Sequence, residues 1–486
     1  MNGELFAGYP ACPADEAVRP DGRLRDAYVP LGLERLGLSG LRAAADVMAA
    51  ERAERGVAVG RWADGRQQVR PLVLDPVPRI VPAAEWAALA AGVEQRHRAL
   101  NSFLAEAYRA AGRRRDDADR APQVVRAGVL PDWAVAHSPG RDPDAVGQAW
   151  PGQPRATVAG TDVLCTTDGS WLVAKDNLRV PAGLGYALAN RQSLRGALPS
   201  LFSDCRPADP FDAVPLLRAG LEAAAPPGIP GTPRIAVLTS GESDNAWFEH
   251  RLLADALGVP LVRAADVWPR LDGGVEVSVG GQRLPVDVLY RRFDDGLLGA
   301  FRVPMGSPLE SLLTEAVRSG LLGLANVPGN ALADDAAAYA WVPAMIRFYL
   351  GEEPLLASVP TWVLADEQQW TEVRDRLHEL VVRPVAGYGG RGAVFGPTCS
   401  AAELASLQAE VAAAPYRFVA QEPVETSTVP TLVDSALVPR HVELRVFSVA
   451  GAAGATHALP APRTSVALDA DPNQTSGGSK DTWVVG

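Results

Sequence analysis

The stretch that decides the fold is His378-Glu-Leu-Val-Val-Arg-Pro-Val-Ala-Gly-Tyr-Gly-Gly-Arg-Gly-Ala-Val-Phe-Gly396. An apolar run, Leu380 to Val382, enters it, and a second one, Ala393 to Phe395, leaves it. Glycines lie between the two runs at positions 387, 389, 390 and 392. Because glycine has no Cβ, backbone amides in such a loop can approach phosphate oxygens closely. The pattern predicts a hairpin flap over a nucleotide with Arg383 at its root, and a loose surface hairpin is the alternative.

The continuation after the glycines excludes two common nucleotide-binding loops. Rossmann and Walker loops open a helix, because the helix N-terminus holds the phosphate. Here Ala393 to Phe395 continues as a strand. A plain Rossmann-type binding protein is therefore excluded, whereas a flap between two strands is not.

Composition limits the class of protein. A chain of 486 residues predicts two or three domains, and 47% hydrophobic with 21% charged residues is typical of globular proteins. The net charge of -11 argues against nucleic acid as a partner. Widely spaced cysteines at 12, 165, 205 and 399 predict reduced thiols. With no apolar leader and no membrane-length apolar run, we expect a cytoplasmic protein without a membrane partner.

The remaining patterns predict a mixture of helices and sheets. A helical periodicity on one face favours a largely helical region up to about residue 125, with the positions Trp86, Leu89, Val93, Leu100, Leu104 and Tyr108. Asp75 to Arg79 is predicted to be a stiff extended connection. Apolar runs at 156–164 and 171–177, joined through Thr167-Asp-Gly169, predict a β-hairpin. Strand, helix and strand between 234 and 293 predict a parallel sheet.

Polar residues on the predicted hairpin suggest a metal site. Asp162 and Asn177 can supply the oxygen ligands that Mg²⁺ prefers. If this segment forms a strand, Asp176 and Asn177 point to opposite faces of the sheet, so only one of them faces the site. The alternative is a hairpin with incidental polar residues.

Cationic residues elsewhere can hold carboxylates or phosphates. Each is by itself as compatible with a surface charge or a structural ion pair: Arg179, Arg291, Arg292, Arg445 and Lys480. The loop Ser240–Asn245 is expected at a cleft, beyond the carboxyl ends of parallel strands, together with Arg291-Arg292 and Asp294-Asp295. Glu249 and His250 are either a catalytic pair or a half-buried helix face.

Taken together, the chain from about residue 70 to the end resembles the circularly permuted ATP-grasp family (type 2). These are predicted carboxylate–amine ligases related to glutathionylspermidine synthase-like ATP-grasp proteins. The segments that carry the resemblance are Pro78–Trp86, Asp176–Arg179, Phe248–His250, Asp287–Arg292, Gly351–Pro354, Arg440–Arg445 and Gly477–Trp483.

The resemblance implies an α/β (α+β) fold in four parts. A helical N-terminal region (1–125) precedes the metal-strand part of the permuted ATP-grasp domain (126–215). A Rossmann-like, parallel-sheet pre-ATP-grasp domain (216–330) follows, and the nucleotide-binding part with the glycine flap (331–486) closes the chain. The permutation explains why the metal strands precede the flap.

The resemblance also implies the chemistry. ATP and Mg²⁺ are the expected cofactors, with Arg383 and the glycines Gly387, Gly389, Gly390 and Gly392 over the phosphates. Adenine and ribose are expected near Gln421, Glu422, Val424 and Glu425. A substrate carboxylate is phosphorylated to an acylphosphate, and an amine then displaces the phosphate. The implied catalytic residues are Arg179, Arg291, Arg445 and Lys480.

Three positions depart from the family pattern. Lys175 stands where an acidic metal ligand is expected, Arg383 replaces the lysine at the flap root, and Ala336 replaces a lysine after Asp334-Asp335. Because Lys175 exchanges an anionic ligand for a like charge, it puts the use of Mg²⁺ in question. Two hypotheses follow. One is an ATP-dependent ligase for small-molecule or peptide carboxylates and amines; the other is a catalytically degenerate nucleotide- or peptide-binding partner of an active paralogue.

Overall fold

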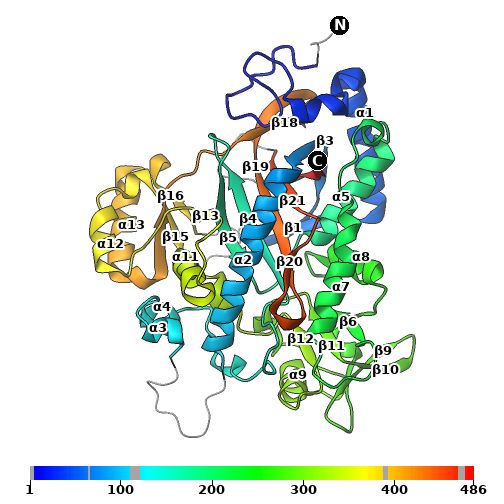
Figure 1. The fold of residues 1–486 in the computed structure, drawn as a ribbon, viewed down its shortest axis with the longest axis vertical. Coiled ribbons are helices and arrows are strands. Elements are labelled where there is room, and N and C mark those ends of the chain that lie inside the picture. Colours follow the sequence, from blue (N-terminus) through cyan, green and yellow to red (C-terminus); the bar gives the residue numbers. More distant parts are fainter. Residues whose placement is uncertain (1–4, 64–65, 110–120, 387–391, 469–476) are drawn as a thin grey trace.

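Among the residues that the computed structural model describes (5–63, 66–109, 121–386, 392–468 and 477–486), a mixed sheet of nine strands forms the centre (Figure 1). Its order is β13 (Ala357–Ser358), β5 (Trp171–Asn177), β4 (Val158–Cys165), β19 (Ala436–Ala450), β21 (Arg463–Ala467), β22 (Gly477–Val485) and β3 (Val73–Pro82). β19 also pairs with β18 (Thr428–Val433) and β20 (Thr456–Ala458). The antiparallel pairing of β4 with β5 confirms the predicted hairpin.

Helix α2 (Ala83–Ala107) covers one face of this sheet (Figure 1). Its Leu89 and Val93 are buried, as the helical periodicity predicts, against alternate residues of three strands: Val163, Val173, Leu444 and Val446. Side chains alternate along a strand, so the residues between these positions point to the opposite face. That opposite face carries the candidate site.

The first 125 residues contain strands as well as the predicted helices. α1 (Leu33–Arg55) and α2 confirm the helical expectation, but β1 (Ala58–Ala63) and β2 (Arg66–Pro71) form a hairpin between them. Asp75 to Arg79 is extended, as predicted, and belongs to β3, which pairs in parallel with β22. The sequence does not predict this pairing, because proline lacks an N–H donor and is uncommon inside strands.

The parallel sheet predicted between 234 and 293 is confirmed. Its order is β12 (Gly323–Ala325), β11 (Val288–Arg291), β6 (Ile235–Leu238) and β7 (Leu261–Val262). α8 (Trp247–Leu257) joins β6 to β7 and ends at Gly258, whose φ of 62° favours glycine. The remaining elements of this part are α7 (Ala213–Ala223), α9 (Leu309–Arg318), β8 (Val267–Pro269), β9 (Val275–Val279) and β10 (Gln282–Val286).

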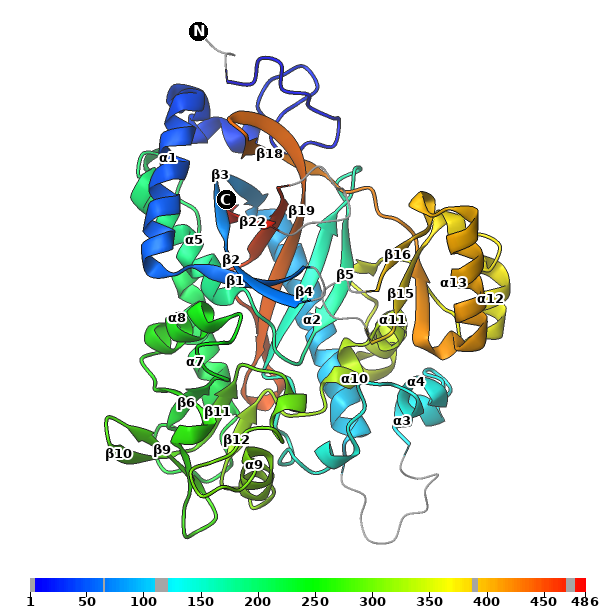
Figure 2. The same ribbon diagram turned by 180° about the vertical axis from the view of Figure 1, so that it is seen from behind.

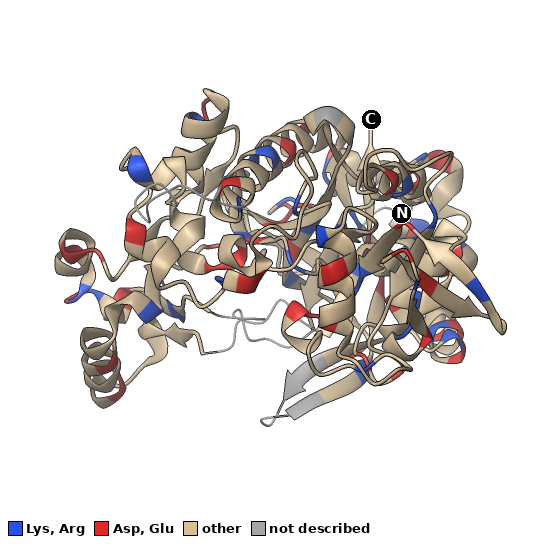
Figure 3. Cartoon of the chain, turned by 90° about the horizontal axis from the view of Figure 1, so that it is seen from below, with Lys and Arg blue, Asp and Glu red and all other residues tan. Residues whose placement is uncertain are grey.

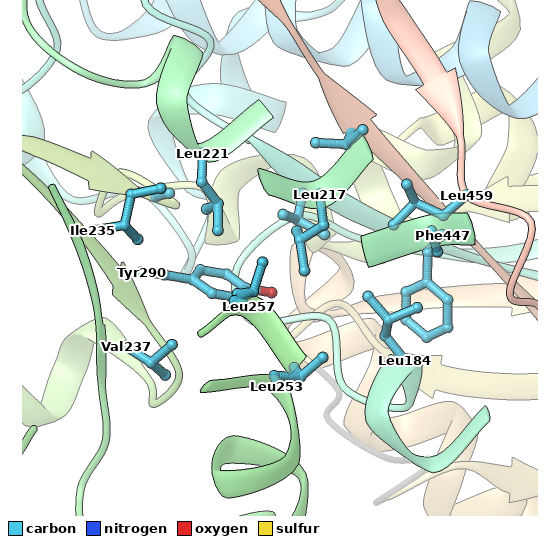
Figure 4. Close-up of a cluster of buried hydrophobic side chains, with 14 of the residues drawn as sticks. Leu184, Leu217, Leu221, Ile235, Val237, Leu253, Leu257, Tyr290, Phe447 and Leu459 are labelled. Atoms are coloured by element: carbon cyan, nitrogen blue, oxygen red, sulfur yellow. The ribbon is translucent and has the colours of Figure 1, made fainter. Parts of the chain in front are cut away.

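One apolar cluster joins the parallel sheet to the nine-stranded sheet (Figure 4). Ile235 and Tyr290 come from the parallel sheet, and Phe447 comes from β19. Leu184, at the start of α5 (Leu184–Ala197), packs in the same cluster. Each large apolar side chain buried in this way contributes about 1.5–3 kcal/mol. The cluster therefore holds the parallel sheet against the face of β19 that is opposite α2.

A second sheet carries the glycine hairpin, and Figures 1 and 2 both place it beside β5. Its order is β14 (Thr361–Val363), β17 (Phe418–Gln421), β15 (Val381–Pro384) and β16 (Val394–Phe395). β15 and β16 are antiparallel, so the predicted arrangement of strand, loop and strand is confirmed. The predicted phosphate-binding glycines Gly387, Gly389 and Gly390 lie outside the described residues. Gly392 is described and has a φ of 75°, which favours glycine.

Helices cover the second sheet on both faces. α12 (Glu367–Val373) and α13 (Ala401–Ala413) pack on one face, and α11 (Ala336–Leu350) packs on the other. Shorter helices connect the larger parts: α3 (Gln123–Arg126), α4 (Asp132–Ala136), α6 (Leu201–Asp204) and α10 (Ala331–Asp334).

Acidic and basic residues are mixed along the described chain (Figure 3). Of the described helices, none is long and apolar enough to cross a membrane.

Lys480 of β22 lies in the core of the large sheet. Its Nζ donates to Asp75 Oδ1 at 2.5 Å, to Pro430 O at 2.8 Å and to Val77 O at 3.0 Å. The side chain has no exposed surface. Three acceptors use all three N–H donors of the ammonium group, so Lys480 ties β22 to β3 and β18. The catalytic role predicted for Lys480 has no support in this geometry.

Replacing Lys480 by methionine should destabilise the protein strongly. The variant leaves the Asp75 carboxylate buried without its cation, which typically costs about 3–5 kcal/mol. Thermal unfolding followed by circular dichroism measures the effect. The control is Arg35→Met, which removes an exposed ion pair to Asp204 of 2.9 Å; such pairs contribute less than about 1 kcal/mol. Equal melting temperatures for the two variants would contradict the structural role of Lys480.

Candidate nucleotide and substrate site

Four charged side chains form a row across the face of the large sheet that is opposite α2. Asp162 of β4 lies opposite both Lys175 of β5 and Arg445 of β19, and Arg445 lies opposite Arg463 of β21. Residues opposite one another on neighbouring strands share a face. With strands about 4.8 Å apart, the row is roughly 14 Å long. We call these four residues the charge row.

The other face of the same strands holds a buried ion pair. Arg96 of α2 donates from Nε to both carboxylate oxygens of Asp176 at 2.8 Å. Both side chains are almost fully buried, and burial raises the pKa of Asp176, although Arg96 opposes this shift. Asp176 therefore faces α2, which agrees with the prediction that only one residue of the Asp176-Asn177 pair faces the site. Arg96 lies 80 residues from Asp176 in the chain, so no local pattern predicts this ion pair.

Arg445 engages Asp162 with a two-pronged ion pair. Its Nε and Nη2 donate to the two carboxylate oxygens at 2.6 and 2.7 Å. Its Nη1 donates to Ala182 O at 2.8 Å, which ties the loop after β5 to β19. Such forked pairs are both strong and well oriented. The structure thus brings two predicted site residues together, as partners of one another.

The predicted magnesium ligands do not fit a divalent cation in this arrangement. Both oxygens of Asp162 accept hydrogen bonds from Arg445, and Asn177 Oδ1 accepts from Val180 N at 3.2 Å. Lys175, opposite Asp162, adds a positive charge to the same place. Within the described ranges, His, Cys, Asp and Glu form no group of three that could hold a metal ion. We therefore assign no step of the chemistry to Mg²⁺.

Lys175 is one of only two lysines in the chain, the other being Lys480. Burial lowers its pKa, and the charges of Arg445 and Arg383 lower it further, whereas Asp334 and Asp162 raise it. Residues from both sheets thus act on one ammonium group.

Arg179 joins three parts of the fold at the edge of the charge row. Its Nη1 donates to Asp294 after β11 at 3.0 Å, and its Nε donates to Asp334 of α10 at 3.1 Å. Asp334 also accepts a hydrogen bond from Leu178 N. Burial raises the pKa of Asp334, although Arg179 opposes this shift. Arg179 is about one-fifth exposed, so its position fits contact with a ligand as well as the two ion pairs.

Arg291, the remaining cationic residue predicted to be catalytic, is buried among backbone carbonyls. It donates to Phe293 O and, at 3.3 Å, to Asn326 O. Its exposed fraction is 1%. A side chain so enclosed orders the loop after β11, and this geometry gives no support to the catalytic role predicted for Arg291.

Glu249 and His250 are fully buried, rather than half-buried or a catalytic pair. Glu249 Oε1 accepts hydrogen bonds from Gly183 N at 2.7 Å and Gly185 N at 3.0 Å, so it holds the start of α5. His250 bonds Thr239 through Nδ1 at 2.9 Å, and burial lowers its pKa to about 2.

The predicted nucleotide-binding residues lie along the second sheet. Arg383 at the end of β15 donates to Gln421 Oε1 at 2.9 Å, and Gln421 Nε2 donates to Thr361 at 2.9 Å. Glu422 and Glu425 are exposed and Val424 is half-buried in the segment after β17. Exposed acids beside a strand end suit the hydroxyl groups of a ribose.

Ala336 begins α11 at the root of the glycine hairpin. Its N–H donates to Val385 O at 3.2 Å, and its side chain packs in a small apolar cluster with Val363 and Val419. Position 336 therefore carries no cation where the family pattern places a lysine.

Two sheets, one with a glycine hairpin and the other with a row of charged side chains, form an ATP-grasp fold. The chain belongs to the circularly permuted ATP-grasp type 2 family, whose model matches residues 78–467. The family confirms the fold that the sequence resemblance predicts.

Several known proteins are similar to this chain. A relative from Frankia alni, provisionally named glutamate–cysteine ligase 2-3, is 41% identical over 99% of this chain and 54% of its own length. An uncharacterised protein of Mycobacterium tuberculosis is 37% identical over 99% of this chain and 86% of its own. The chain thus spans about half the length of the Frankia relative. The apo structure of a glutathione synthetase-like effector from Globodera pallida has a TM-score of 0.57 and 13% identity, covering 92% of this chain and 97% of that one.

Asp335 beside the site is a buried carboxyl group whose protonation affects stability. Its Oδ1 accepts from Ala338 N at 2.6 Å and caps α11, and its Oδ2 accepts from Ser138 Oγ at 2.5 Å. Burial raises its pKa to about 7. Because the folded state then binds the proton more tightly than the unfolded state, this group makes stability fall as the pH rises from about 4 to about 7.

Asp335→Asn should remove this part of the pH dependence, since asparagine can still cap the helix. The melting temperature of the variant relative to the wild type should therefore rise between pH 4 and pH 7. Thermal unfolding at a series of pH values measures the difference. Asp366→Asn, at the half-buried N-cap of α12, is the matched control. Parallel curves for Asp335→Asn and the wild type would contradict the assignment.

Proposed function

We propose that the protein is an ATP-dependent carboxylate–amine ligase that binds the triphosphate between its two sheets. The observation that carries the proposal is that the sheet bearing Arg383 lies beside β5, the strand that bears Lys175 (Figures 1 and 2). The two cations are close enough for Arg383 to lower the pKa of Lys175. Asp334 and Asp162 act on the same ammonium group in the opposite sense, so charges of both signs meet at this place. In this proposal the phosphate chain of ATP contacts both cations, which fork-shaped and ammonium donors suit.

The residues of this cleft have distinct roles in the proposal. Arg383 holds the phosphates from the side of the hairpin, and Lys175 holds them from the large sheet. Arg179, oriented by Asp294 and Asp334, faces the substrate carboxylate. Glu422 and Glu425 bind the ribose side of the nucleotide. These fixed charges lower the barrier because they are oriented before the reaction begins.

The reaction has two steps. A carboxylate oxygen of the substrate attacks the γ-phosphorus of ATP, and the bond to the bridging oxygen breaks, so that ADP leaves. The amine nitrogen then attacks the acyl carbon, inorganic phosphate leaves and the nitrogen loses a proton. The name of the Frankia relative supports this class of reaction, because a glutamate–cysteine ligase joins a carboxylate to an amine.

A second candidate function rests on the Arg445–Asp162 ion pair. The pair uses the carboxylate oxygens of Asp162, which is expected to bind Mg²⁺. Lys175 stands where a further acidic ligand is expected. A protein with this pair can bind a nucleotide or peptide without turnover and assist an active paralogue. The two candidates differ in whether bound ATP is consumed.

Thermal shift with ATP, with and without Mg²⁺, followed by ADP release in the presence of mixed amino acids, tests the proposal. The ligase predicts a stabilising shift and ADP release that depends on added amino acids. A shift without ADP release favours the non-catalytic partner. No shift at millimolar ATP contradicts the ligase and a nucleotide-binding partner, and leaves only the peptide-binding form of the second candidate.

Lys175 can be followed directly, since the chain has only one other lysine and that one is buried. Reductive methylation with ¹³C-formaldehyde of the native protein should label Lys175 and the N-terminus, and ATP should shift the Lys175 signal. Lys175→Met should weaken ATP binding about tenfold, as expected for the loss of one charge-assisted contact, whereas Lys175→Arg should retain part of it. An unchanged signal together with unchanged affinity would contradict a phosphate contact.

A further inference from the structure

Arg463, in the charge row, forms no ion pair with any described residue. Arg445, directly opposite, is paired with Asp162. The guanidinium of Arg463 makes no ion pair or hydrogen bond to any residue in the described ranges, and its Nε is buried without a partner. Like charges directly opposite one another on adjacent strands are destabilising. The end of the row therefore holds a cation that forms no ion pair with any described residue.

The surroundings hold the side chain in place. The guanidinium lies over the ring of Tyr186 at 5.7 Å, and Tyr186 is itself fixed by a hydrogen bond to Ala58 O of 2.7 Å. A Cβ at Gly183, whose φ is 126°, would lie only 2.9 Å from Arg463 Cδ. Glycine at this position therefore permits the close packing. A cation–π contact contributes about 0.5–2 kcal/mol and does not replace a counter-ion.

Two acids, Glu249 and Glu443, lie in the neighbourhood, but neither forms an ion pair with Arg463. Glu249 is engaged by the amides of Gly183 and Gly185 and by Arg292 at 3.4 Å. Glu443 lies on the same face of β19, opposite Ser465. Burial and Arg445 lower the pKa of Arg463, despite the opposing influence of both acids.

The position in the sheet favours a carboxylate over the nucleotide phosphates as the missing anion. Lys175 stands at the end of the row beside the glycine hairpin, and Arg463 stands three strands away, at a distance of roughly 14 Å. The phosphates bound by Lys175 and Arg383 are thus at the opposite end. A guanidinium fork matches the two oxygens of a carboxylate.

We propose that Arg463 binds a second, non-reacting carboxylate of the acid substrate, which makes the protein selective for dicarboxylic acids. The reacting carboxylate lies nearer Arg179 and Lys175, and the second lies beyond Arg445 over β21. The inference rests on the proposed function, because it concerns the substrate of the same cleft.

Binding of glutarate and valerate to the full chain tests this inference without ATP turnover. The two acids have the same number of carbons and differ in the second carboxylate. Ligand-observed NMR titrations should give an affinity for glutarate about tenfold higher than for valerate, as for one charge-assisted contact. Arg463→Gln should abolish this preference, and Arg463→Lys, which keeps the charge without the fork, should reduce it. The matched control is Arg283→Gln, outside the charge row. Arg283 belongs to β10, and its guanidinium lies 3.7 Å from the centre of the Trp268 ring.

Equal binding of the two acids, no binding of either, or a preference that survives in a folded Arg463→Gln variant would overturn the inference. A loss of ATP affinity in Arg463→Gln with the preference for glutarate intact would also overturn the inference, because that result would assign Arg463 to phosphate binding. Circular dichroism of both Arg463 variants establishes that they fold. A preference for glutarate in a protein that neither binds nor consumes ATP would support the dicarboxylate site and contradict the ligase.

Discussion

The ion pair between Arg445 and Asp162 is the constraint on which the site depends. It joins neighbouring strands of the large sheet, and through Ala182 it holds the loop that follows β5. That loop carries Arg179, which reaches Asp334 of α10 and Asp294 of the parallel-sheet part. The same pair uses the carboxylate that the family resemblance assigns to Mg²⁺. One ion pair thus links the charge row, the loop that carries Arg179 and the carboxylate expected to bind the metal.

Features encoded by neighbouring residues could be predicted from the sequence. The glycine hairpin, the β4–β5 hairpin and helix α8 with its glycine stop all depend on local apolar periodicity and turn residues. The sequence predicts β3 only as an extended segment. Its partner strand β22 lies about four hundred residues away, and prolines are uncommon inside paired strands. The domain limits derived from the resemblance stay a prediction.

The candidate site was predicted in part, because a charged residue's partner decides its role. Arg179, Arg445 and Asp162 were singled out, and they lie together. Lys480 has the same residue type as Lys175, yet its ammonium group lies in the core with three acceptors. Arg96 and Arg463 were missed. The alternation of Arg463 to Ala467 could have revealed a strand, but only the register with β19 places Arg463 beside Arg445.

The most direct test of this account is a crystal structure with a non-hydrolysable ATP analogue and Mg²⁺. The account predicts that the γ-phosphate lies within hydrogen-bonding distance of Lys175 Nζ while Arg445 remains paired with Asp162. An Asp162 carboxylate that has left Arg445 and coordinates Mg²⁺, with Lys175 turned away from the phosphates, would contradict it.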